Sequence, residues 1–147
     1  MKTLIVAVDG SRGAEVAVKV AADITTSSNA ELVLAHVIES DELPEQFREF
    51  VESEHLENAT RTGRELLADH ILSSAANLAR DRGARQVRVV VVRGDPVKAI
   101  LDIADGERAD AIVVGHRGLG RLQGLLLGSV AQKLVTYAHR TVIVARS

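Results

Sequence analysis

The stretch LIVAVDGS, residues 4–11, begins with five consecutive apolar residues and ends in an aspartate, a glycine and a serine. An apolar run without polar alternation is typical of a strand buried on both faces, as in a parallel sheet covered by helices. The next segment places apolar residues at helical spacing, at Ala17, Val20, Ala21 and Ile24. A strand, a polar turn and a helix are therefore predicted in this order.

The same alternation continues along the chain. Further apolar runs predict strands over 31–38, 86–92, 110–114 and 141–145, and helical patterns fall at 47–51, 67–78, 97–104 and 130–138. Gly83 is predicted to end one helix, and Asp95 followed by Pro96 to begin another. This order predicts one Rossmann-like α/β domain, 1–147, whose five-stranded, doubly wound parallel sheet has helices on both faces.

The segment 39–65 departs from this regularity. It is rich in charged residues and long for a simple crossover between strands. We expect a solvated helix or a partly mobile insertion there rather than a functional lid.

The composition narrows the function classes. The absence of cysteine excludes disulfides and thiolate metal sites. A net charge of −2 and only three aromatic residues argue against a nucleic-acid partner. No apolar run approaches the roughly 20 residues that span a bilayer, and the N-terminal run is too short for a signal peptide. The expectation is a cytoplasmic protein without a nucleic-acid or membrane partner.

Ligands of open parallel sheets bind beyond the carboxyl ends of the strands, so the residues that follow each strand are the candidates. The richest of these segments is GHRGLGRLQGLLLGSV, residues 115–130, which holds five of the eleven glycines. Glycine lets a ligand approach the backbone, and the free amides at a helix N-terminus attract anions. The segment therefore predicts a phosphate site to which the Ser129 hydroxyl, His116 and Arg117 contribute.

The glycine spacing excludes a Walker P-loop, because no lysine follows Gly128. Gly115, Gly118, Gly128 and Ser129 instead form the pattern G-x2-G-x9-G-S. This pattern resembles the nucleotide motif of the ATP-binding branch of the universal stress protein family. The segments VAVDGS, AHVIE, GDPVKAI and ADAIVVG, in this order, are similar to that family as well.

The resemblance implies the strand order 3-2-1-4-5 and an adenine nucleotide, ATP with or without Mg. Residues at the first strand would line the nucleoside, one residue near the end of the second strand would meet the adenine edge through its backbone, and the glycine segment would border the ribose and the phosphates. In that order these residues are Ala7, Val8 and Asp9; Val37; Val114, Gly115, His116, Arg117 and Gly118; and Gly128, Ser129 and Val130.

Structural explanations compete for some of these residues. Asp9 or Ser11 serves equally well as a cap of the first helix, and Gly128 with Ser129 as a plain helix start. Leu125, Leu126 and Leu127 are expected to pack or to form an interface. No catalytic or metal-ligating constellation is evident, so the protein is expected not to be an enzyme, or at most to hydrolyse ATP slowly.

The sequence leaves two other classes open. One is a receiver-like signalling domain, which would need an acidic cluster and a lysine after the last strand, where Arg146 stands. The other is an enzyme that uses a dinucleotide or transfers a nucleotidyl group. In the family order, the strand at 141–145 lies at a sheet edge without a proline, so we expect a homodimer through that strand. The downstream protein partner is not given by the sequence.

Overall fold

The computed structural model describes residues 1–39, 63–117 and 127–147. Along the chain the described elements are β1 (Thr3–Ala7), α1 (Arg12–Ser28), β2 (Glu31–Ile38), α3 (Gly63–Asp81), β3 (Gln86–Arg93), α4 (Pro96–Gly106), β4 (Ala111–Gly115), α5 (Ser129–Tyr137) and β5 (Thr141–Ala145). In these ranges no helix combines the length and the apolarity that a membrane crossing requires.

The five strands form one parallel sheet in the order β3-β2-β1-β4-β5, as predicted. The predicted strand bounds differ by at most one residue from the observed ones. Residues 40–62, most of the segment that was expected to be irregular, lie outside the described part of the chain, and α3 begins at Gly63. Gly83 follows α3 with a φ of +100°, which confirms its role as a helix stop.

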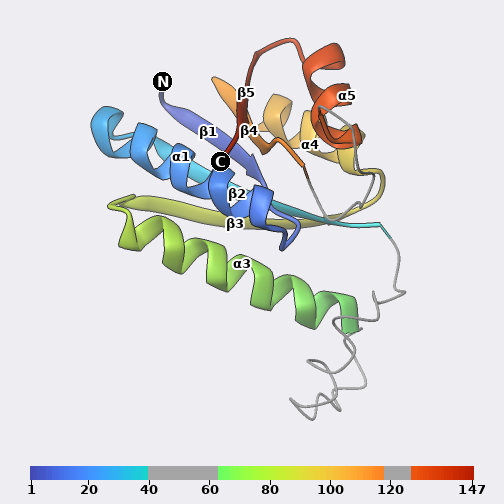
Figure 1. Cartoon of the computed structure of the whole chain (residues 1–147), viewed down its shortest axis with the longest axis horizontal. Helices are drawn as coiled ribbons and strands as arrows, with labels where there is room; N and C mark the ends of the chain where they lie inside the picture. Colours follow the sequence, from blue (N-terminus) through green and yellow to red (C-terminus); the bar gives the residue numbers. More distant parts are fainter. Residues whose placement is uncertain (40–62, 118–126) are drawn as a thin grey trace.

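Two hydrophobic cores lie on opposite faces of the sheet. Figure 1 shows α1 and α3 together on one face and α4 and α5 on the other. Consecutive residues of β1 point alternately into these cores: Leu4 and Val6 pack against α1, and Ile5 packs on the side of α4 and α5. Both faces of β1 are therefore buried, which explains its unbroken apolar run.

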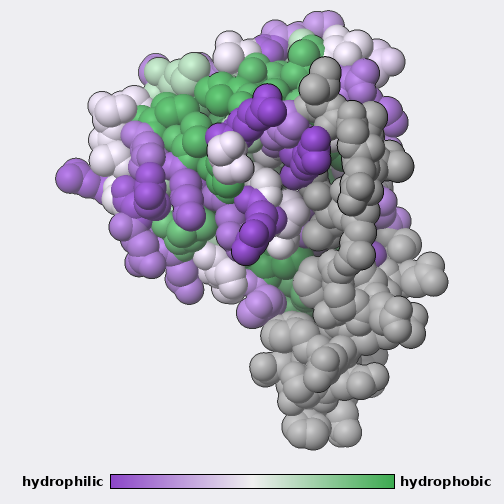
Figure 2. All heavy atoms as spheres, in the orientation of Figure 1, coloured by the Kyte–Doolittle hydropathy of each residue, from purple (hydrophilic) through white to green (hydrophobic). Residues whose placement is uncertain are grey.

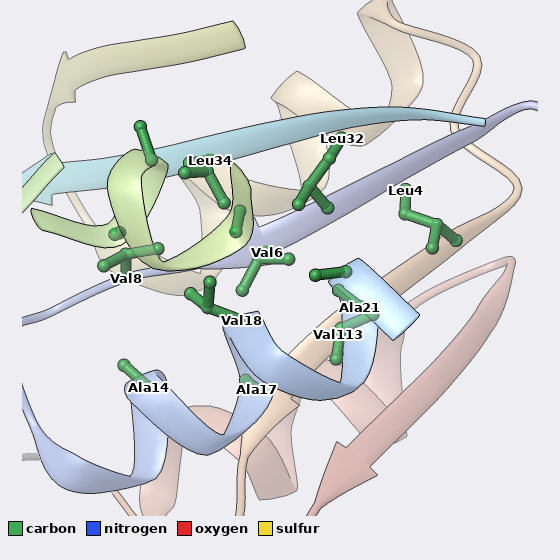
Figure 3. Packing of buried hydrophobic residues seen from close by; sticks show 14 of the residues in the cluster. Leu4, Val6, Val8, Ala14, Ala17, Val18, Ala21, Leu32, Leu34 and Val113 are labelled. Atoms are coloured by element: carbon green, nitrogen blue, oxygen red, sulfur yellow. The ribbon is translucent and has the colours of Figure 1, made fainter. Parts of the chain in front are cut away.

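Small residues let α1 lie close to the sheet. In Figure 3, Ala17 and Ala21 of α1 face the strands beside Val18, and Val6 and Val113 approach from β1 and β4. All five side chains are fully buried. An alanine stripe on α1 brings the helix start close to the ends of β1 and β4, where the candidate site lies.

The carboxylate of Asp110 ties the start of β4 to the start of β1. Its Oδ2 accepts hydrogen bonds from the backbone N–H groups of Lys2, at 2.6 Å, and Thr3, at 2.9 Å. These two bonds to the charged form lower the pKa of Asp110 below its ordinary value. Asp110 therefore precedes the strand rather than belonging to it.

Candidate functional site

A cavity of about 290 Å³ opens at the carboxyl ends of the central strands. Strand order reverses between β1 and β4, and this switch point is where doubly wound sheets place their ligands. Residues of both cores and of the loops line it: Ala7, Val8, Asp9, Ser11, Ala14, Ala35, His36, Val37, Glu39, Pro96, Ile100, Val114, Gly115, Arg117, Gly128, Ser129, Val130 and Ala131. The apolar majority with a few polar groups is typical of a small-molecule site.

The turn after β1 is built by Asp9, Gly10 and Ser11. Gly10 has a φ of +86°, a left-handed conformation that favours glycine. The Ser11 hydroxyl accepts a hydrogen bond from Ala14 N at 3.1 Å, so Ser11 is the N-cap of α1. Asp9 Oδ1 accepts one from Ser11 N at 2.9 Å. The capping role thus belongs to Ser11, and Asp9 braces the turn with one oxygen while it lines the cavity.

Packing requires a glycine at position 115. A Cβ atom at this position would lie 2.5 Å from the carbonyl oxygen of Gly13 and 2.9 Å from its Cα. A Cβ atom at Gly13 would likewise collide with the backbone carbonyl of Arg117. The first turn of α1 and the end of β4 therefore touch backbone to backbone, through two glycines. The expectation that Gly115 serves only to let a ligand approach is incomplete for this reason.

The start of α5 forms one wall of the cavity. Gly128 is the N-cap and supplies no side-chain hydrogen bond, and the N–H of Gly128 donates to the carbonyl oxygen of His116 at 2.8 Å. That amide is consequently engaged in closing the loop. The next three residues, Ser129, Val130 and Ala131, line the cavity at the positive end of the helix dipole. An anion in the cavity would meet these amides and the Ser129 hydroxyl.

The structure brings ten of the twelve predicted site residues to one cavity. His116 does not line it; its backbone N–H donates to Ala145 and its carbonyl accepts from Gly128. Gly118 lies outside the described residues. The cavity therefore lies where the carboxyl ends of β1, β2 and β4 meet the start of α5, as predicted from the topology. His116 is not among the residues that line it.

Several lining residues were not predicted. Pro96 and Ile100 come from α4, and His36 and Glu39 from the end of β2. The sequence held a signal for two of these four residues. Pro96 comes shortly after the end of β3, and His36 is a polar residue within the apolar run of β2. Ala131 had no such signal, because an alanine in a helical stripe is equally typical of a core.

The cavity carries charges of both signs. Two acidic residues, Asp9 and Glu39, and one basic residue, Arg117, are among those that line it. Among the residues described, no group of three or more histidine, cysteine, aspartate or glutamate side chains is placed to hold a metal ion. The fold and the cavity together define a doubly wound α/β protein with a cavity at its switch point.

Comparison with known proteins identifies the family. The sequence model of the Universal stress protein family matches residues 1–146, and the chain belongs to this family. A universal stress protein of Thermus aquaticus is 35% identical over 147 residues, covering 99% of this chain and 98% of the relative. The Mycobacterium tuberculosis universal stress protein Rv1636 is 32% identical over 146 residues, with coverages of 99% and 97%.

Solved structures agree with this assignment. A universal stress protein solved in complex with cAMP is 29% identical, with a TM-score of 0.72 over 99% of this chain and 96% of that chain. UspA from Lactobacillus plantarum, at 24% identity and a TM-score of 0.78 over 99% and 97% of the two chains, shares the fold. The predicted family membership and the predicted strand order are thus both confirmed.

Proposed function

We propose that this protein binds ATP in the cavity at the switch point and acts as a nucleotide-dependent regulator in the stress response. The observation that carries the proposal is the convergence, in one cavity, of the α5 start, the Asp9 turn and the end of β2. The amides at the start of α5 suit phosphates, and a carboxylate suits ribose hydroxyls. The relative solved with cAMP supports an adenine nucleotide as the ligand class.

Each wall of the cavity has a distinct role in this proposal. Val37 lies in β2, one residue before its end at Ile38, and would meet the adenine edge through its backbone. Asp9 would bind the ribose with the carboxylate oxygen that does not brace Ser11. Ser129 and Val130 would hold the phosphates, with Arg117 adding positive charge at the rim. The Gly128 amide, which bonds His116, would shape the phosphate loop rather than bind the anion.

The proposed role is binding without catalysis, or with slow hydrolysis at most. The cavity lining holds one histidine, His36, and its Nδ1 lies 2.7 Å from the Val8 carbonyl oxygen. Magnesium would enter with the nucleotide, since Mg²⁺ is commonly held by phosphate oxygens and one or two carboxylates. Asp9 or Glu39 fits that requirement, because both line the cavity.

We also propose a cytoplasmic homodimer joined through β5. This strand lies at the sheet edge beside β4, and Val142, Ile143 and Val144 are partly exposed. Figure 2 shows hydrophobic surface in the upper part of the molecule, the region in which Figure 1 draws β5. An apolar edge strand exposes unpaired backbone groups, and a two-fold axis pairs two copies of it.

Mass spectrometry of small molecules released from the purified protein tests the ligand class. ATP or another adenine nucleotide at a stoichiometric level supports the proposal. A dinucleotide such as NAD or FAD would contradict it and indicate the enzyme class. If nothing is released, titration of the protein with ATP decides between a nucleotide-binding regulator and a protein without this ligand.

A further inference from the structure

We propose that His36 is a positioning residue that fixes the turn carrying Asp9 and thereby sets the nucleotide affinity. The inference rests on the proposed function, since it assigns to His36 the ordering of one wall of that site. His36 itself acts through the backbone of Val8 rather than through a reacting group.

His36 occupies a position where an apolar side chain is expected. Leu32 and Leu34 precede it on the same face of β2, and both are fully buried in the core beneath α1 and α3. The His36 side chain is 6% exposed. A polar group in such a place is retained only when it is hydrogen-bonded, so its partner indicates its role.

The partner of His36 is the loop after β1. Its Nδ1 lies 2.7 Å from the carbonyl oxygen of Val8. A carbonyl oxygen only accepts hydrogen bonds, so Nδ1 carries the proton and donates it. The position of the carbonyl therefore places a hydrogen on Nδ1.

Both backbone groups of Val8, the N–H and the carbonyl, are therefore hydrogen-bonded to residues of β2. Its N–H donates to Ala35 O at 2.8 Å, and its carbonyl accepts from the neighbouring residue His36. Val8 lies one residue beyond the end of β1, where regular strand pairing stops. The imidazole thus extends the attachment of β1 to β2 by one further hydrogen bond.

This bond controls the orientation of Asp9. The Val8 carbonyl and the Asp9 N–H belong to one planar peptide unit, so fixing the first fixes the second. From there the attachment continues through Asp9 Oδ1 to Ser11 N, and through Ser11 Oγ to Ala14 N at the start of α1. Without the imidazole donor, the peptide between Val8 and Asp9 would rotate more freely in front of the cavity.

Two substitutions separate the donor from the bulk of the ring. His36→Asn places an amide N–H₂ at a reach similar to that of Nδ1, whereas His36→Leu fills the space without a donor. Leu34→Val is the matched control, since it changes the same face of the same strand at a residue that does not line the cavity. All three variants are compared with the wild type as full-length chains.

Two measurements are made on each protein. Amide hydrogen exchange without nucleotide reports the order of residues 8–14, and calorimetric titration with ATP reports affinity. We expect faster exchange at residues 9–11 in His36→Leu and an affinity about five- to tenfold lower, as for the loss of one hydrogen bond. His36→Asn should lie within about twofold of the wild type in affinity, as expected where its donor is kept. Leu34→Val should leave both readouts unchanged apart from global stability.

Unchanged exchange at residues 9–11 in His36→Leu would overturn the positioning role. Faster exchange with wild-type ATP affinity would overturn the link to the nucleotide. Equal losses in His36→Asn and His36→Leu would show that ring packing, not the donor, matters. Failure of the wild type to bind ATP would refute the proposed function instead, and the exchange data would still decide whether His36 orders the turn.

Discussion

The close approach of Gly13 and Gly115 makes a quantitative prediction for Gly115→Ala. An alanine Cβ would lie 2.5 Å from the Gly13 carbonyl oxygen, whereas ordinary contact begins near 3.4 Å. The first turn of α1 would have to move away by about 1 Å, or β4 would have to bend. Both segments are backbone in a closely packed region, so the cost belongs at the upper end of the usual 1–3 kcal/mol for overpacking, about 3 kcal/mol.

Urea unfolding followed by circular dichroism measures this cost. With a slope of about 2 kcal/mol per molar, the midpoint should fall by about 1.5 M. Gly106→Ala is the control, because a Cβ there meets nothing within 4 Å at the end of α4. This control should be neutral or more stable by up to about 1 kcal/mol. If Gly115→Ala unfolds at the same midpoint as the control, the backbone contact between α1 and β4 does not exist as described.

Three further predictions concern charge, the ligand and assembly. Asp110→Asn should make the free energy of unfolding less dependent on pH at acid pH. The pKa of Asp110 is lowered in the native state, so its stabilisation is fully present above pH 3.8, the pKa of the unfolded state, and is lost as the pH falls through the lowered native pKa. Urea titrations at several pH values that show the same acid dependence for the wild type and Asp110→Asn would contradict this. Asp9→Ala should reduce the rise in melting temperature caused by ATP, whereas Asp95→Ala, which removes the cap of α4 at a residue that does not itself line the cavity, should cost about 1 kcal/mol of stability and keep the full rise. Val142→Pro should convert a particle of about twice 15.7 kDa in light scattering into a monomer, and a monomeric wild type at micromolar concentration would refute the proposed dimer.

The fold was predictable from the sequence because the two central strands, β1 and β4, are unbroken apolar runs. Parallel strands between two helix layers have no solvent face, so LIVAV and AIVV could not be mistaken for half-exposed strands. Helix starts were predictable where proline or a capping side chain marked them, as at Asp95 and Pro96. The strand order itself followed from the family resemblance, since periodicity carries no information on which strands are neighbours.

The candidate site was predictable only in part. Residues at the carboxyl end of a strand or just beyond it, such as Val37 and Asp9, could be placed beside one another by topology alone. The partner of each backbone group could not be predicted, because it depends on distances between segments far apart in the chain. Two such contacts that the sequence did not predict are the hydrogen bond from the Gly128 amide to the His116 carbonyl and the close approach of Gly13 to Gly115.

Calorimetric titration with ATP of the wild type and of Gly128→Val tests the central claim most directly. Gly128 lines the cavity, and its φ of −63° is open to any residue, so valine adds bulk to the phosphate wall without straining the backbone. The account predicts saturable binding of one ATP per chain by the wild type, and no measurable binding by a Gly128→Val variant with an unchanged circular dichroism spectrum. A wild type that does not bind ATP, or a folded variant that binds it with wild-type affinity, would contradict the account.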